Sequence, residues 1–155
     1  LSIINDNYPE INSFRDCNEE LFIGLKSKMT YNVFRRSLYA VKEIKRVILA
    51  CAALDNGDIE TLGKLMFETH DGLSKDYEVS CVELDYLVDL AKAEEDVIGS
   101  RLMGGGFGGC TINLVKKGSE IKIKEKFTKL YAEHFKIDLL TYDVKISNGT
   151  SLYKN

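Results

Sequence analysis

The sequence predicts an α+β domain in which helices pack on a small, mainly antiparallel sheet. Through the first part of the chain, apolar residues recur at steps of three or four, the period of an amphipathic helix. In later segments apolar and polar residues alternate, as they do along a half-buried strand. A glycine-rich stretch separates two of these segments. This change of period between the two halves favours the α+β class.

Length and composition exclude several classes of protein. The chain has 155 residues, which suits one domain over residues 1–155 rather than two. Its 21 Lys and Arg nearly balance 24 Asp and Glu, leaving a net charge of −3, whereas nucleic-acid binders normally carry a basic excess. No apolar run approaches the roughly 18 residues of a membrane helix, and no signal peptide is recognisable. We therefore expect a cytoplasmic protein that binds neither nucleic acid nor membrane.

Four helices are expected before the glycine-rich stretch. Thr30 is placed to cap a long helix, and Asn56-Gly57 to end it, because glycine readily takes the left-handed conformation at a helix C-terminus. Asp58 is placed to cap the helix that follows. The expected helices run from Asn12 to Lys28, from Thr30 to Asn56, from Asp58 through Thr69, and from Val82 to Ala93.

Two strands, a helix and a last strand are expected in the second half. Residues 97–103 and 110–115 read as strands, and a charged amphipathic helix follows over about 119–135. The clearest alternation lies in residues 140–147, which predicts a strand with one face inward. The side chains expected on that inward face are Leu140, Tyr142, Val144 and Ile146.

The cysteines give no sign of a metal or redox site. They are spaced by about thirty residues each, so no pair has the short spacing of a zinc site or a redox motif. Each lies among apolar residues, which favours buried free thiols over a disulfide framework. The four positions are Cys17, Cys51, Cys81 and Cys110.

The most unusual local feature is residues 104–109, in which five of six residues are glycine. Ordering glycine costs roughly 0.5–1 kcal/mol more than ordering alanine, so we expect either positive φ or close approach of a ligand or another backbone. Successive N–H groups in such a loop suit a phosphate. Gly104, Gly106 and Gly109 match G-x-G-x-x-G, but that fingerprint opens a helix, and here a strand-like segment follows. A long hairpin loop without a ligand remains the alternative.

A second segment, residues 68–81, gathers a histidine, acids, a lysine and a tyrosine at a helix end. These groups suit acid–base or phosphate chemistry. A structural interpretation is favoured, with His70 as a partly buried helix-end residue and Asp76 or Ser80 as an N-cap of the next helix. His134 lies on a charged helix face and is expected to be inert.

These two segments, in this order, resemble the galactokinases, which belong to the GHMP family of small-molecule kinases. Residues 100–115, SRLMGGGFGGCTINLV, are similar to the third motif of that family. Residues 65–91, LMFETHDGLSKDYEVSCVELDYLVDLA, are similar to the galactokinase pattern L-M-x-x-S-H-x-S-L-x-x-D-Y-E-V-S-C-x-E-L-D. Thr69 and Gly72 stand where that pattern has serines. The resemblance extends from about Tyr8 to the C-terminus.

The resemblance implies the fold of a GHMP kinase C-terminal domain, which is ferredoxin-like, and transfer of the γ-phosphoryl group of ATP to the anomeric hydroxyl of galactose, assisted by Mg²⁺. It implies that the glycine-rich loop lies near the nucleotide phosphates. It places the catalytic residues and the sugar contacts in an N-terminal domain that is absent from this chain, which begins with Leu1 rather than Met. No catalytic residue or metal ligand is therefore expected here, and the chain alone is expected to be inactive. The implied ATP-binding residues are Gly104, Gly105, Gly106, Phe107, Gly108 and Gly109.

Two other functions remain open from the sequence. One is a kinase of the same superfamily that acts on another small-molecule acceptor, and the other is a non-catalytic sugar- or ATP-sensing regulator. Tyr31-Asn32 superficially resembles a sugar-binding segment of galactokinases. Because that segment is expected upstream of Leu1, no sugar contact is assigned to Tyr31.

Overall fold

The computed structural model describes residues 2–149, 151 and 152. The α-helices are α1 (Ser2–Asn5), α2 (Glu19–Gly24), α3 (Tyr31–Asp55), α4 (Ile59–Lys75), α5 (Val82–Lys92) and α6 (Glu120–Phe135). The 3-10 helices are η1 (Phe14–Asp16) and η2 (Lys26–Lys28), and the strands are β1 (Val97–Met103) and β2 (Cys110–Val115). Among the residues described, no helix combines the length and apolarity that crossing a bilayer requires.

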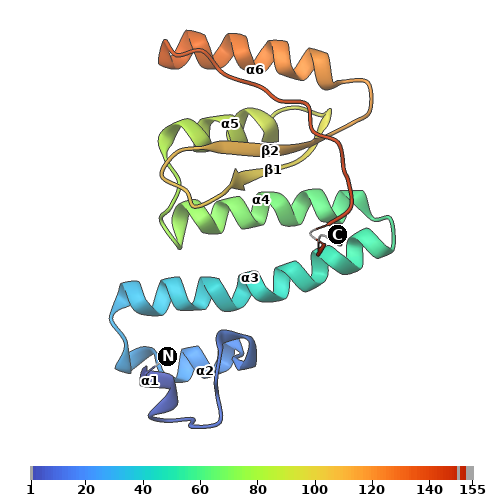
Figure 1. Cartoon of the computed structure of the whole chain (residues 1–155). Coiled ribbons are helices and arrows are strands. Elements are labelled where there is room, and N and C mark those ends of the chain that lie inside the picture. The colour runs from blue at the N-terminus through green and yellow to red at the C-terminus, as the bar shows by residue number, and fades with distance from the viewer. Residues whose placement is uncertain (1, 150, 153–155) are drawn as a thin grey trace.

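The elements are stacked in layers around a two-stranded hairpin (Figure 1). In this view α5 and then α6 lie above the strands, whereas α4, then α3, then the short N-terminal helices lie below them. β1 and β2 pair antiparallel, from Gly99 opposite Leu114 to Met103 opposite Cys110. The predicted α+β class, the antiparallel pairing and the bounds of these two strands are confirmed.

Helix α4 lies directly against the backbone of β1 at a contact between two glycines. A Cβ atom on Gly63 would lie 2.1 Å from the carbonyl oxygen of Ile98, and one on Gly99 would lie 2.5 Å from the Cα atom of Gly63. Real Cβ atoms do not approach other heavy atoms this closely, so both positions require glycine. The contact fixes the position of α4 relative to the strand that leads into the glycine-rich loop.

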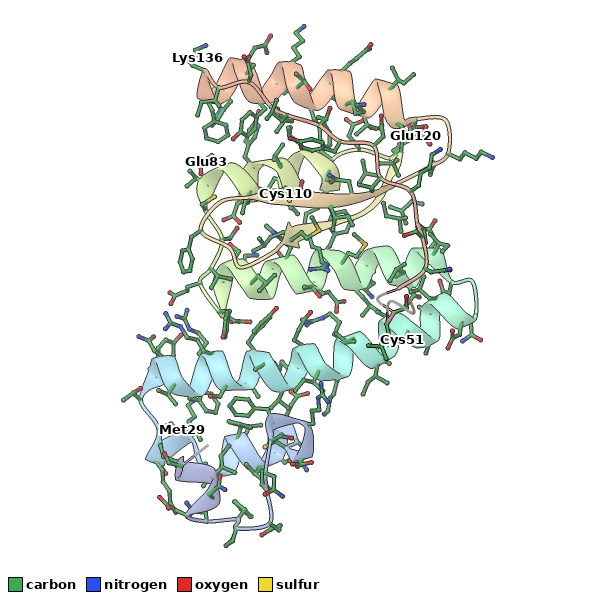
Figure 2. The ribbon with its side chains drawn as sticks, viewed as in Figure 1. Met29, Cys51, Glu83, Cys110, Glu120 and Lys136 are labelled. Carbon is green, nitrogen blue, oxygen red and sulfur yellow. The ribbon has the colours of Figure 1, made fainter. Side chains whose placement is uncertain are left out.

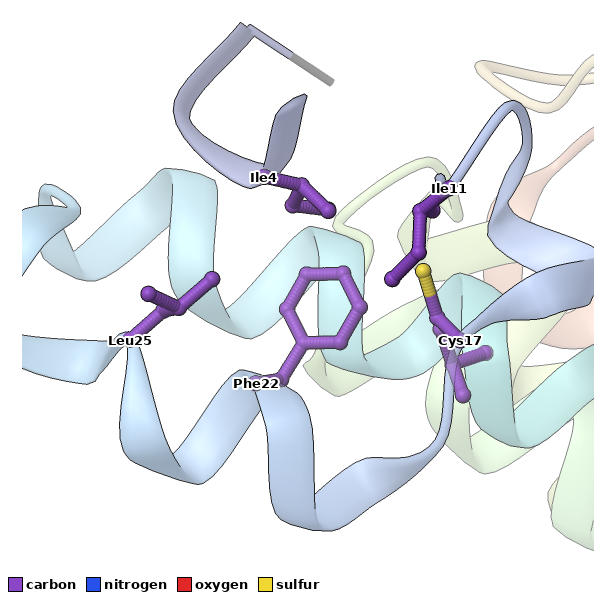
Figure 3. Close-up of a cluster of buried hydrophobic side chains, with 6 residues drawn as sticks. Ile4, Ile11, Cys17, Phe22 and Leu25 are labelled. Atoms are coloured by element: carbon purple, nitrogen blue, oxygen red, sulfur yellow. The ribbon is translucent and has the colours of Figure 1, made fainter. Parts of the chain in front are cut away.

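Two hydrophobic cores lie on opposite sides of the α3–α4 pair. The first joins the N-terminal helices to α3 around Phe22, which is fully buried (Figure 3). The second lies between the hairpin, α5 and α6. Side chains of α5 and α6 fill the space between these two helices (Figure 2). Its buried members are Leu87, Ala91, Val97, Ile123, Phe127 and Tyr131.

The predicted caps of the long helices are present. The Thr30 side chain accepts a hydrogen bond from the Val33 N–H, and that of Asp58 accepts one from the Thr61 N–H. Gly57 follows α3 with φ +68°, the left-handed conformation expected there. Helix α4 continues to Lys75, well beyond the predicted end at Thr69.

The single helix predicted over residues 12–28 is wrong. This segment contains η1, α2 and η2, because two polar side chains start new helices inside it. Ser13 and Asp16 form a capping box at η1, and the Asn18 side chain accepts a hydrogen bond from the Leu21 N–H at the start of α2. Cys17, between these two helices, is extended.

The strand predicted over residues 140–147 is also wrong, since the described part of the chain forms no strand after β2. An alternating pattern identifies a segment that is suited to pairing in a sheet, but pairing also needs a partner strand with a free edge. The four side chains expected to face inward are instead 75–103% exposed. The cysteine prediction is partly wrong: all four are free thiols, but Cys51 and Cys110 are exposed, Cys81 is half-buried, and only Cys17 is buried. Cys51 lies on an outward-facing side of α3, which the apolar neighbours in the sequence do not reveal.

Candidate functional site

The glycine-rich loop connects the two strands of the hairpin, closed by the pair Met103 and Cys110. Five of its six residues have positive φ, which side chains other than glycine rarely adopt. The backbone conformation therefore explains four of the five glycines, all except Gly105. The φ values are +94° at Gly104, +86° at Gly106, +57° at Phe107, +125° at Gly108 and +95° at Gly109.

One side of the loop is held, and the rest is open. A Cβ atom on Gly106 would lie 2.1 Å from the carbonyl oxygen of Val79, in the turn between α4 and α5. Around the Cβ positions of Gly104, Gly105 and Gly108, the described residues leave open space to 4 Å. At these three positions the backbone is therefore open to an approaching group, whereas at Gly106 it is covered by Val79.

Phe107 is the one residue of the loop that is not glycine, and it is 78% exposed. Its N–H donates a hydrogen bond of 2.7 Å to the carbonyl oxygen of Val79. This bond and the close approach of Gly106 join the loop to the α4–α5 turn at one end of the molecule, on the left in Figure 1.

The loop itself contains no acid or base, so its backbone shape and N–H groups are what it offers a ligand. In the part of the chain that the structure describes, no cluster of three or more His, Cys, Asp or Glu side chains could hold a metal ion.

His70 lies beside the base of this loop, 3% exposed, at the meeting point of α4, α5 and β1. Its Nδ1 atom accepts a hydrogen bond of 3.1 Å from the N–H of Leu102, so the neutral ring carries its proton on Nε2. Nε2 lies 3.1 Å from Oδ1 of Asp85, whose Oδ2 accepts a 2.9 Å hydrogen bond from Ser74. Burial lowers the pKa of His70 below its usual value, although Asp85 opposes this effect.

The structural interpretation of His70 is favoured by this geometry, since both ring nitrogens are occupied by partners within the fold. The proposed N-caps are wrong: Asp76 is the C-cap of α4, and α5 begins after Cys81 without a side-chain cap. His134 is exposed and stacks on Tyr86 at 4.4 Å between ring centroids.

Sequence reasoning missed the groups that hold the α4–α5 turn. Arg35 and Arg36, from the start of α3, both bind the carboxylate of Glu78. Glu78 has φ +60°, a conformation usually marked by glycine or asparagine, so the sequence gives no local signal for it. The crowding of charges in residues 68–81 was the available hint, but nothing in it indicates a partner some forty positions earlier.

Comparison with known protein families shows which family this chain belongs to. Residues 50–133, from the last turns of α3 to near the end of α6, match the family described as GHMP kinases C terminal. The chain belongs to the GHMP kinase family. The matched region contains the glycine-rich loop and the His70 network, so the resemblance inferred from the sequence is confirmed.

Individual relatives of this GHMP kinase chain are galactokinases. It is 42% identical over 137 residues to a galactokinase of Thermotoga petrophila, covering 88% of this chain and 38% of that protein. A galactokinase of Bos taurus is 44% identical over 113 residues, or 73% of this chain and 29% of that protein. The crystal structure of Lactococcus lactis galactokinase complexed with galactose matches with a TM-score of 0.83 and 29% identity, over 89% of this chain and 36% of that one. The matched part of the chain thus spans between 29% and 38% of the length of these relatives.

Proposed function

We propose that this GHMP kinase chain is the C-terminal domain of an ATP-dependent galactokinase. The observation that supports it most is the glycine-rich hairpin loop, with its positive-φ backbone and open face, within a chain 42% identical to a galactokinase over 137 residues. ATP is the phosphoryl donor implied for the family, and galactose is the acceptor named for the relatives. Mg²⁺ is proposed as the ion that accompanies ATP.

In this proposal the loop acts through its backbone. The N–H groups of the loop glycines face the nucleotide phosphates, while the Phe107 N–H stays bonded to Val79. Hydrogen bonds from these fixed donors stabilise the negative charge that shifts during phosphoryl transfer. Glycine at the open positions lets the phosphates approach closely. The sugar contacts and the base are assigned to the part of the protein outside this chain, as the resemblance to galactokinases implies.

The proposed reaction joins the anomeric oxygen of galactose to the γ-phosphorus of ATP. The bond from that phosphorus to the β–γ bridging oxygen breaks, its electron pair leaves with ADP, and the hydroxyl proton passes to a base. The products are galactose 1-phosphate and ADP.

The test is an acceptor survey with the full-length protein. ADP release is followed with ATP and Mg²⁺ in the presence of galactose, other hexoses, mevalonate or homoserine. We expect kcat/KM for galactose to exceed that for every other acceptor by roughly 10²-fold or more, the discrimination achieved by sites built to bind particular hydroxyl groups. Faster turnover of another acceptor would reassign the substrate, and ATP binding without turnover of any acceptor would indicate a regulator.

A further inference from the structure

Three charged side chains connect the start of α3 to the α4–α5 turn. Nη2 of Arg35 lies 2.5 Å from Oε2 of Glu78, and Nη2 of Arg36 lies 3.0 Å from the same oxygen. Arg35 also donates a hydrogen bond of 2.9 Å from Nη1 to the carbonyl oxygen of Lys75, the last residue of α4. We call Arg35, Arg36 and Glu78 the charged cluster.

The charged cluster holds a backbone conformation that glutamate rarely adopts. At φ +60°, the Cβ atom of Glu78 crowds the neighbouring carbonyl, so this conformation persists only where other contacts fix it. Two charge-assisted bonds on one carboxylate oxygen are such contacts. They add to the backbone hydrogen bond from the Val79 N–H to the carbonyl oxygen of Leu73, which spans the same residue, so their loss weakens the hold on this conformation.

The next residue carries this constraint to the glycine-rich loop. Val79 donates its N–H to the carbonyl oxygen of Leu73 in α4 at 3.0 Å, and its own carbonyl accepts the 2.7 Å bond from Phe107. The same carbonyl is the group that a Cβ on Gly106 would strike. A rotation of the backbone at Glu78 therefore moves the carbonyl oxygen to which the Phe107 N–H is bonded and against which Gly106 lies.

We propose that Arg35, Arg36 and Glu78 are positioning residues for the glycine-rich loop and act on it through the carbonyl oxygen of Val79. The inference rests on the proposed function, in which that loop receives the phosphates of ATP. None of the three residues needs to touch the nucleotide. They select the loop conformation that binds it, which lowers the ordering cost of binding.

The experiment compares two single-charge removals in the full-length protein. Glu78→Gln keeps the size of the side chain but weakens both ion pairs. Asp71→Asn is the matched control, because Asp71 is a similarly exposed carboxylate in α4 that binds Lys75 and Lys92. For each variant, kcat and KM for ATP are measured at saturating galactose, and hydrogen exchange is measured at the Phe107 amide.

We expect Glu78→Gln to raise KM for ATP roughly fivefold with kcat within about twofold, and to accelerate exchange at Phe107 roughly tenfold, effects typical of losing one coupled contact. Asp71→Asn should change neither. Equal values in both variants would overturn the proposal. So would accelerated exchange spread evenly over the whole protein, because that result indicates general destabilisation.

Arg36 provides a second pair of variants if Glu78→Gln does not fold. Arg36 makes a single bond to Glu78, so Arg36→Lys should stay close to the wild-type KM, whereas Arg36→Gln should raise it. Identical KM values for these two variants would contradict the proposal. If the wild-type protein does not phosphorylate galactose, the proposed function fails, and exchange at Phe107 still decides whether the charged cluster holds the loop.

Discussion

Two neighbouring glycines of the loop differ in whether a side chain could replace their hydrogen atom. Gly106 has φ +86° and approaches Val79, whereas the neighbouring Gly105 lacks positive φ and has open space around it. The sequence GGG gives no indication of this difference, because it depends on a turn about 27 positions earlier. The need for glycine could thus be predicted from composition, but the contact that makes one glycine irreplaceable could not.

This difference gives a first prediction. Gly106→Ala should destabilise the chain by about 1–3 kcal/mol, because it combines a strained φ with a clash against backbone. Gly105→Ala should stay within about 0.5 kcal/mol of the wild type. Urea denaturation of both variants measures the effect, and equal stabilities would show that the loop moves away from Val79 at no cost.

The buried histidine gives a second prediction, in the pH dependence of stability. Because burial lowers the folded-state pKa of His70 below 6.5, the unfolded chain binds more protons in acid, and stability is lost as the pH falls below about 6.5. The groups facing the ring are Asp85 and Lys92 from α5 and Asp71 from α4. His70→Gln should flatten the pH dependence of unfolding by up to about 1.4 kcal/mol per pH unit.

Exposed His134 is the matched control for this measurement, and His134→Gln should keep the steeper acid slope. Denaturant unfolding between pH 8 and 5 compares the three proteins. An unchanged slope in His70→Gln would mean that folding does not shift the pKa of His70.

Helices and strands were predictable where a local signal starts or ends them. Thr30, Asp58 and Gly57 mark the ends of α3 and the start of α4, and the structure agrees with each. Prediction failed where a segment depends on its surroundings. The caps at Ser13 and Asn18 divide one apparent helix, and residues 140–147 alternate well but pair with no described strand.

The exposed segment after Leu139 gives a third prediction. Residues 140–149 are exposed, and Asp143 forms an exposed ion pair with Lys124, a kind that contributes at most about 1 kcal/mol. Removing residues 140–155 should therefore change the free energy of unfolding by no more than about 1 kcal/mol. Phe127→Ala in the second core, by comparison, should cost about 3–5 kcal/mol. A larger loss on truncation would show that the segment joins the sheet in solution.

In the proposed kinase the catalytic residues lie outside this chain, whose described part contributes two cores and the glycine-rich loop. A fourth prediction follows: the 155-residue chain folds alone and releases no ADP in response to galactose. Cooperative thermal unfolding by circular dichroism tests the first statement, and a coupled ADP assay tests the second. Galactose-dependent ADP release from the purified chain would refute the division of labour proposed between the two parts of the protein.

Helix α3 takes part in both halves of the molecule. Phe34 and Leu38 pack against the first core, while Arg35 and Arg36, on other sides of the same turns, bind Glu78. In a genetic screen for lost sugar phosphorylation, substitutions of Phe22 would then be recovered beside those of Gly106. A geneticist mapping such alleles onto the sequence alone would find two separate groups, and only the helix between them explains a common phenotype.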